Sequence, residues 1–306
     1  MNAVARRLLS SIPALIGILT ITFFLLPLVP GDPVDLMLGE QASIADKSAL
    51  RHELDLDLPL PQRFAKFTGG LVQGNLGTSF TTHQPVTALI GERLPATLEL
   101  AVSSMLLALA IGIPMGVFAA IKKRKAFDHF ARVFSVTGSS LPSFWIGPLL
   151  VYIFAIKLDL LPVSERGGIS HLILPATTLA VGLAAILSQV TRAAMLEVLN
   201  EDFVRTAKAK GAGLSRIYFR HALANASIPI ITISALQFGA VLTGTVIVET
   251  IFDWPGLGTL LLQAIQTRDY PVVQGTVLVI ALVYAAVNLT ADLLYLTANP
   301  KLRSAA

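Results

Sequence analysis

The chain has 306 residues, of which 54% are hydrophobic and only 14% are charged. Soluble proteins carry about 25% charged residues, so this composition is typical of a membrane protein. The absence of cysteine excludes disulfide frameworks, zinc–cysteine sites and cysteine nucleophiles. The small formal charge of +4, without a basic stripe interleaved with aromatic residues, argues against a nucleic-acid partner.

Six apolar segments are long enough to cross a bilayer, which requires about 20 helical residues. They lie at residues 8–29, 97–121, 130–156, 172–191, 229–250 and 272–296. The first is too long for a signal-peptide core and lacks a small-residue cleavage site, so we expect it to remain as a helix. The chain is therefore predicted to be an all-α membrane protein, with a single transmembrane domain over residues 1–306.

Basic residues are concentrated on one side of this predicted topology. Of the 23 Lys and Arg residues, 15 lie at the N-terminus, in two loops and in the tail. These positions are Arg6, Arg7, Lys122, Lys123, Arg124, Lys125, Arg132, Arg192, Arg205, Lys208, Lys210, Arg216, Arg220, Lys301 and Arg303. The positive-inside rule then predicts six spans with both termini and both basic loops in the cytoplasm.

The longest loop between spans, residues 31–94, is predicted to be an extracytoplasmic insertion. Ser43 and Asp46 have the spacing of a capping box, and Pro61 suits the start of a further helix. An apolar stripe on that helix is formed by Phe64, Phe67 and Leu71. The stripe suits an interfacial helix that lies on the bilayer or on the outer helix ends, and packing onto the protein's own spans is favoured over binding of a partner.

The sequence contains no arrangement of residues that is typical of an enzyme. There is no P-loop motif, the five histidines are scattered, and no nucleophile elbow surrounds the serines at 138–143. Acidic residues in the spans, Glu99, Glu249 and Asp292, fall toward span ends, whereas a proton-coupled carrier is expected to use a mid-membrane carboxylate. An intramembrane enzyme and a stand-alone channel or secondary carrier remain as alternatives to a transport subunit powered by another protein.

Small residues and prolines mark candidate helix contacts and bends. Gly112 and Gly116 have GxxxG spacing on one face of the second predicted span, with Pro114 between them. Pro142 and Pro148 predict a bent third span. Ordinary bundle packing and lining of a transport pathway are both open interpretations of these five positions.

The segment 192–228 is a basic, glycine-interrupted stretch between two apolar spans. Arg205 and Lys208 share one face of a predicted helix, which Gly211 interrupts. Ser215 is a candidate N-cap for a second short helix. Attraction to anionic lipid explains the charges but not the helix–Gly–helix arrangement, so we interpret the segment as a docking element.

This segment resembles the ATPase-docking loop of permease subunits of ATP-binding-cassette (ABC) importers. The resemblance is closest to the B-type permeases of the dipeptide, oligopeptide and nickel family, and it extends over the whole chain. Matching stretches are "LVPGDPV" (28–34), "QGNLGTSF" (73–80), "LPSFWIGPLLVY" (141–152), "LLPVSERGG" (160–168), "TRAAMLEVLNEDFVRTAKAKG" (191–211), "VIVETIFDWPGLGTLLLQAIQTRDYPVVQG" (246–275) and "NLTADLLY" (288–295). Two departures are an extra residue after the loop glycine, in "GAGLSRI", and Asn299, where the family commonly has Asp.

The resemblance implies particular docking residues. Arg205, Thr206 and Ala207 occupy the positions of the family's Glu-Ala-Ala motif, and Gly211 is the loop glycine. The implied docking residues are Arg205, Thr206, Ala207, Lys208, Ala209, Lys210, Gly211, Leu214, Ile217, Tyr218 and Arg220.

The resemblance also implies the setting in which the chain works. The expected fold is that of a type I ABC importer permease in the bacterial inner membrane, surrounded by lipid. The expected partners are a C-type permease, two ABC ATPase subunits and an extracytoplasmic solute-binding protein. ATP and Mg²⁺ would be bound by the ATPases, so no catalytic, cofactor or metal site is expected in this chain. Dipeptides, longer peptides, nickel chelates, glutathione and some sugars or opines all remain open as the solute, and no substrate-binding residue is identified.

Overall fold

The computed structural model describes residues 3–28, 31–39 and 41–298. Within these ranges the chain is helical, and the only β-pairing is one isolated bridge between Thr78 and Pro85. The prediction of an all-α protein is therefore confirmed. Asn299, Lys301 and Arg303 lie outside the described residues, as do the side chains of Arg6, Arg7 and Asp292.

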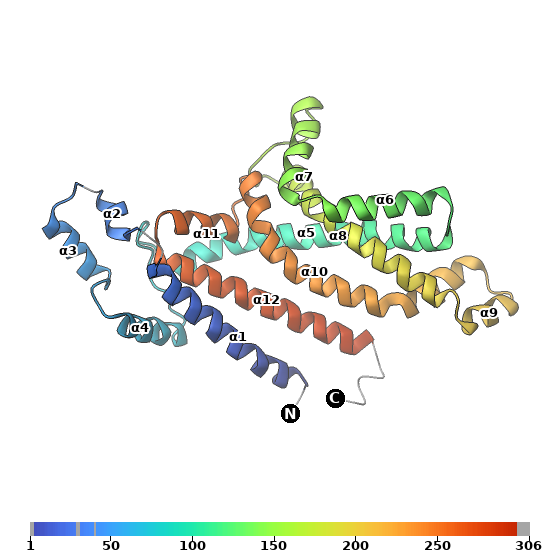
Figure 1. Cartoon of the computed structure of the whole chain (residues 1–306), viewed down its shortest axis with the longest axis horizontal. Coiled ribbons are helices and arrows are strands. Elements are labelled where there is room, and N and C mark those ends of the chain that lie inside the picture. Colours follow the sequence, from blue (N-terminus) through green and yellow to red (C-terminus); the bar gives the residue numbers. More distant parts are fainter. Residues whose placement is uncertain (1–2, 29–30, 40, 299–306) are drawn as a thin grey trace. The chain divides into compact units, whose positions relative to one another are not determined.

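The helices, labelled along the chain in Figure 1, belong to two compact units. The unit that we call the middle unit is built around Leu98–Trp254. Its helices are most of α5 (Val86–Ile121), α6 (Ala126–Ser140), α7 (Ser143–Leu150), the π-helix η2 (Val151–Lys157), α8 (Ile169–Val198), α9 (Asp202–Ala209), the π-helix η3 (Arg216–Ala222) and α10 (Leu223–Ile251).

The second unit, which we call the split unit, combines Ala5–Thr97 with Pro255–Ala285. Its elements are α1 (Ala3–Leu25), the 3-10 turn η1 (Leu26–Leu28), α2 (Pro33–Leu38), α3 (Ile44–Glu53), α4 (Leu60–Val72), the start of α5, α11 (Leu257–Gln266) and most of α12 (Tyr270–Ala298). Its core joins the first turns of α5 to α11 and α12 through Val86, Ile90, Leu257, Val272 and Val273.

Four helices of the described chain are long and apolar enough to span a membrane: Val86–Ile121, Ile169–Val198, Arg216–Val241 and Tyr270–Thr290. They contain or overlap four of the six predicted spans. Residues 130–156 correspond to Ala126–Ser140 and Ser143–Lys157, a pair bent by 107° that raises the number to five if it is one span. The predicted span at 8–29 coincides with most of the helix α1 (Ala3–Leu25) and the turn after it, and its apolar part with described side chains is Ile12–Leu28.

The bend in the third predicted span falls at the first of its two prolines. α6 ends at Ser140, and Pro142 precedes α7 with an extended backbone (φ −69°, ψ 144°). The residue before a proline is disfavoured in the α region, which explains the extended Leu141 (ψ 124°). Pro148, in contrast, lies inside α7, which passes into the π-helix η2.

The glycines of the GxxxG pair lie where α5 and α8 approach most closely. A Cβ atom on Gly112 would stand 2.8 Å from the Ala184 carbonyl oxygen, and one on Gly116 would stand 2.6 Å from that of Ser188. These separations leave no room for a side chain, so the glycines serve helix packing. Pro114 lies between them, and α5 continues through it as a helix.

Local signals in residues 31–94 account for their helices. The Ser43 hydroxyl accepts a hydrogen bond from the Asp46 backbone N–H (3.1 Å) at the start of α3, as the capping-box spacing predicts. The stripe on α4 packs on α1, where the Phe64 ring lies 5.1 Å from that of Phe23 and Phe67 lies 5.7 Å from it. The preference for packing onto the protein's own helices is thus confirmed.

Candidate functional site

The candidate docking segment begins with α9, a two-turn helix that ends in a glycine cap. The Gly211 N–H donates to the Lys208 carbonyl (3.0 Å), and the Ala212 N–H donates to the Ala207 carbonyl (3.1 Å). Together these bonds form a Schellman motif, which requires a left-handed residue, and Gly211 has φ +77°. Helix α9 therefore ends at a glycine, the residue that adopts this left-handed conformation with least strain.

The second helical piece differs from the prediction. The helix resumes at Leu214 and runs without a break through η3 into α10, so it is the start of a long helix and not a separate short one. Ser215 already has helical angles (φ −58°, ψ −44°) and makes no side-chain cap bond, so the predicted N-cap is wrong. The Ile217 N–H instead donates to the carbonyl of Gly213 (3.1 Å). Residues 210–213 therefore form the turn between α9 and this helix.

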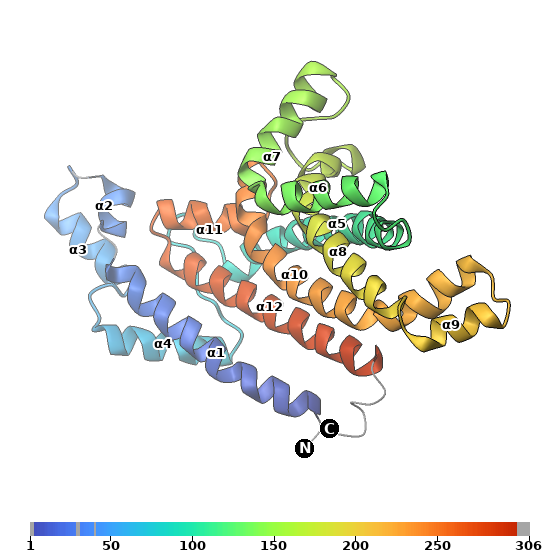
Figure 2. The same cartoon turned by 45° about the vertical axis from the view of Figure 1, so that its right-hand side comes forward.

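The two pieces lie side by side at one end of the middle unit (Figure 2). Val204 of α9 and Ile217 of η3 are both buried. Because Ile217 is fully enclosed by its own chain, the expectation that it contacts a partner is corrected: it supports the segment from inside. Of the other implied docking residues, Ala207 and Tyr218 are half-buried. Those with exposed side chains, or an exposed backbone at the glycine, are Arg205, Thr206, Lys208, Ala209, Lys210, Gly211, Leu214 and Arg220.

The exposed face carries cations that are not bound tightly to the rest of the chain. Arg205 approaches the Asp202 carboxylate at 3.5 Å, but both side chains are more than three-quarters exposed. Such a contact contributes little, because water and salt screen it. The cations of this face are therefore free to interact with an acidic surface.

Helix ends from three spans hold the root of the segment. A buried cluster joins the end of α5 (Val117), the end of α8 (Met195) and the first turns of α10 (Ala226 and Ile230). The segment begins and ends at this cluster, because the chain runs from α8 into α9 and returns through η3 into α10. The docking segment is consequently fixed at its base while its tip is exposed.

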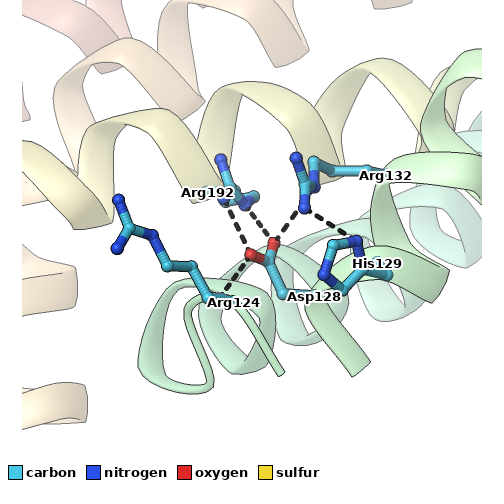
Figure 3. A network of polar contacts seen from close by, with 5 residues as sticks. All are labelled: Arg124, Asp128, His129, Arg132 and Arg192. Carbon is cyan, nitrogen blue, oxygen red and sulfur yellow. Dashed lines mark hydrogen bonds and ion pairs between the residues drawn. The ribbon is translucent and has the colours of Figure 1, made fainter. Parts of the chain in front are cut away.

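A buried carboxylate ties the connection between α5 and α6 to the same base (Figure 3). Asp128, fully buried in the first turn of α6, accepts two hydrogen bonds from the Arg192 guanidinium, of 2.6 and 3.0 Å. Its second oxygen also accepts from the Arg124 backbone N–H (2.8 Å). Arg132 is more distant, at 3.7 Å, and contacts His129. The Asp128–Arg192 pair thus joins α6 to α8 ten residues before α9 begins.

Aromatic rings make a second connection from the same region. The Phe118 ring lies 6.3 Å from Phe127 and 6.2 Å from Phe219 of η3, both edge-on. The Lys122 ammonium stands 5.5 Å from the centre of the Phe127 ring. Residues around the α5–α6 connection therefore contact the helices on both sides of α9. They contact α8 through Arg192 and η3 through Phe219.

Sequence reasoning missed this bracing. The signal that could have pointed to it is that Asp128 is the one acid in the basic stretch 122–132. Its partner lies 64 positions away, and neither helical periodicity nor a local motif connects the two residues.

The chain matches two families of transport proteins. Residues 112–304 match the family described as binding-protein-dependent transport system inner membrane component. Residues 1–101 match the N-terminal family of the same transport systems. The two matches together cover nearly the whole chain.

Several relatives are similar over almost their full length. The chain is 42% identical to the di/tripeptide transport system permease protein DppB of Pseudomonas aeruginosa, with 99% of each chain covered. It is 41% identical to the dipeptide transport system permease protein DppB of Escherichia coli (98% of each). It is 40% identical to the glutathione transport system permease protein GsiC of Pectobacterium atrosepticum (99% of each). All three are named as permease proteins of transport systems, in agreement with a transport subunit and not an enzyme.

A solved structure shares the fold at low sequence identity. An inward-facing form of the MetNI methionine ABC transporter matches with a TM-score of 0.57 and 16% identity, over 69% of this chain and 96% of that one. The chain is an inner-membrane permease subunit of an ABC importer, and it belongs to the family of binding-protein-dependent transport system inner membrane components.

Proposed function

We propose that this chain is a B-type permease subunit that forms, with a C-type permease, the translocation pathway for peptides or a related small solute. Two separate ABC ATPase subunits bind and hydrolyse ATP with Mg²⁺, and an extracytoplasmic solute-binding protein delivers the solute. Identity of about 40% to permeases named for dipeptides and glutathione supports this class of solute.

The observation that carries the proposal is the geometry of the docking segment. Arg205 and Lys208 present exposed charge on a helix whose inner face is buried and whose end is fixed by the Gly211 turn. A rigid, exposed basic surface at a helix–turn–helix suits recognition of an acidic groove on another protein. Closure of the ATPase pair would then move the segment as a lever and shift the permease between inward- and outward-facing states.

The proposal includes a six-span topology with cytoplasmic termini. The excess of Lys and Arg in the basic loops supports it, as do the four long apolar helices and the bent pair. The helix α1 would complete the count as a first span. Residues 31–94 would then lie on the extracytoplasmic side.

Charge reversal on the docking face tests the proposal. The double variant Arg205→Glu, Lys208→Glu should reduce solute-stimulated ATP hydrolysis about tenfold or more, because like charges would face each other across the contact. Co-purification of the ATPase subunits should fall in parallel. The measurement is hydrolysis and uptake by the four-subunit assembly in proteoliposomes.

A matched control reverses two exposed lysines of the other predicted cytoplasmic loop, Lys123→Glu and Lys125→Glu. This control should retain the ATPase subunits and normal uptake. Unchanged hydrolysis and uptake in the Arg205/Lys208 variant would remove the docking role. Uptake by the purified permease without any ATPase would favour a stand-alone carrier.

A further inference from the structure

An open cleft of about 450 Å³ lies within the split unit. One wall comes from α4 and the end of α3, and the other comes from residues 75–83 and the start of α12. The stretches "QGNLGTSF" and "TRDYPVVQG" both contribute to the second wall, although the docking role uses neither. The cleft therefore brings together residues that are about 190 positions apart.

Arg63 is the cation of this cleft that lacks a partner. Its side chain is half-buried, and within the described chain no carboxylate or other acceptor bonds to it. The neighbouring Lys66 is already paired with Asp55. Burial lowers the pKa of the Arg63 guanidinium, an effect that electrostatic interactions with Tyr270 and Asp55 offset only in part. Binding of an anion stabilises a guanidinium that is partly desolvated and has no counter-ion.

The wall opposite Arg63 is held in place without any ligand. Asp269, almost fully buried, accepts hydrogen bonds from the Ser79 hydroxyl (2.5 Å) and from the hydroxyl (3.0 Å) and backbone N–H (3.2 Å) of Thr81. These bonds fix the loop against the first turn of α12. A preformed wall reduces the entropy that binding must overcome.

Aromatic rings form the apolar part of the cleft. Phe23 and Phe67 are stacked with centroids 5.7 Å apart, and Phe80 contacts Tyr270 edge-on at 6.2 Å. All four rings line the cleft. Polar and charged side chains, among them Asn75, His83 and Gln274, line the rest of the cleft, so it can contact an apolar group and a polar group of one ligand.

We propose that this cleft binds an oxyanion, a carboxylate or a phosphate, that is attached to an apolar group. Arg63 binds the oxyanion, and the aromatic rings bind the apolar part. The oxyanion could belong to a small solute or to the headgroup of an anionic lipid. The site is independent of the docking segment, so its failure would leave the proposed transport role intact.

The test uses the full-length permease in phosphatidylcholine nanodiscs, with two probes. N-acetylphenylalanine carries a carboxylate and a ring, and its C-terminal amide has the same shape without the charge. Equilibrium dialysis should show saturable binding of the acid, with an affinity about tenfold or more above that of the amide. In a second arm, native mass spectrometry measures phosphatidylglycerol retained after exchange from mixed-lipid nanodiscs.

Matched variants identify the cation. Arg63→Gln should abolish the preference for the acid or the retention of phosphatidylglycerol, whereas Arg63→Lys should keep part of it. Arg93→Gln, which removes a half-buried arginine outside the cleft, should leave both unchanged. Thermal unfolding of each variant checks that the fold is intact. If Arg63→Gln abolishes the preference for the acid over the amide, the ligand is a small solute. If Arg63→Gln lowers only the retention of phosphatidylglycerol, the ligand is a lipid headgroup. If folded Arg63→Gln behaves like the wild type in both arms, the proposed site is wrong.

Discussion

The docking segment and the cleft of the split unit both present arginine, but they place it differently. Arg205 is more than three-quarters exposed on the outside of α9, whereas Arg63 is half-buried in a cavity among aromatic rings. Water screens the first charge, so its contribution depends on an extended complementary surface. The second is partly desolvated, so a single anion can satisfy it. Exposure thus distinguishes a surface suited to a protein partner from a site suited to a small group.

The two regions also differ in what keeps them rigid. The docking segment depends on a buried ion pair and a core cluster at its base, while its tip stands free. The cleft wall depends on neutral hydroxyl and backbone donors around one buried carboxylate. Three predictions sharpen the comparison between the two regions, in order of expected effect.

The largest effect is expected for Asp128→Ala at the base of the docking segment. The change removes the acceptor of both Arg192 hydrogen bonds and leaves a guanidinium that is only 22% exposed without its anion. Breaking a buried pair in this way costs about 3–5 kcal/mol, so thermal unfolding of the permease in detergent should occur at a clearly lower temperature.

The exposed pair of α9 provides the control for that change. Arg205→Ala removes a cation from a screened contact, so the unfolding temperature should stay close to that of the wild type. Equal unfolding temperatures for Asp128→Ala and Arg205→Ala would show that the buried pair does not brace the segment.

A smaller effect is expected from Gly211→Ala in the turn. At φ +77° an added Cβ costs roughly 1 kcal/mol, although no neighbouring atom would obstruct it. The strain should loosen the turn and reduce the solute carried per ATP hydrolysed by roughly two- to fivefold.

Gly213→Ala is the matched control, because its backbone is not left-handed and the space around it is equally open. Coupling in that variant should match the wild type. Transport per ATP measured in proteoliposomes separates the two variants, and equal losses in both would point away from the turn conformation.

The smallest effect is expected for the pH dependence of the His52–Asp57 pair, near the cleft. The hydrogen bond to Asp57 (2.8 Å) raises the pKa of His52 above 6.5, and the same bond lowers the pKa of Asp57 below 3.8. The contribution of His52 is therefore complete below pH 6.5 and is lost as pH rises through its raised pKa. That of Asp57 is complete above pH 3.8 and is lost as pH falls through its lowered pKa.

The pair should accordingly be intact between these two ordinary values and weaken on either side. An NMR titration of the His52 ring in full-length protein should give a raised midpoint. That midpoint should return toward the ordinary value in Asp57→Asn. Both side chains are exposed, so the unfolding temperature should change little.

Local signals explain which parts of the fold the sequence predicts. Ser43 and Asp46 form their cap within four residues, and α9 ends through two local bonds, from the Gly211 N–H to a carbonyl three positions back and from the Ala212 N–H to one five positions back. The prediction that Ser215 caps a helix is wrong. The helix begins one residue earlier, at Leu214, because the Gly213 carbonyl accepts the first helical hydrogen bond, from the Ile217 N–H. A short polar residue near a helix start favours capping, but the turn geometry decides which residue takes that position.

The sequence by itself determined the membrane composition, the apolar spans, the basic segment and the resemblance to importer permeases. Only the tertiary structure decided which charges are paired: Asp128 with Arg192, Lys66 with Asp55, and Arg63 with none of the described residues. The physical reason is that helical periodicity and capping act over a few residues, whereas burial and ion pairing depend on which distant helices pack together. The proposed docking face could therefore be recognised in the sequence, but the residues that brace it and the cleft proposed to bind an oxyanion could not.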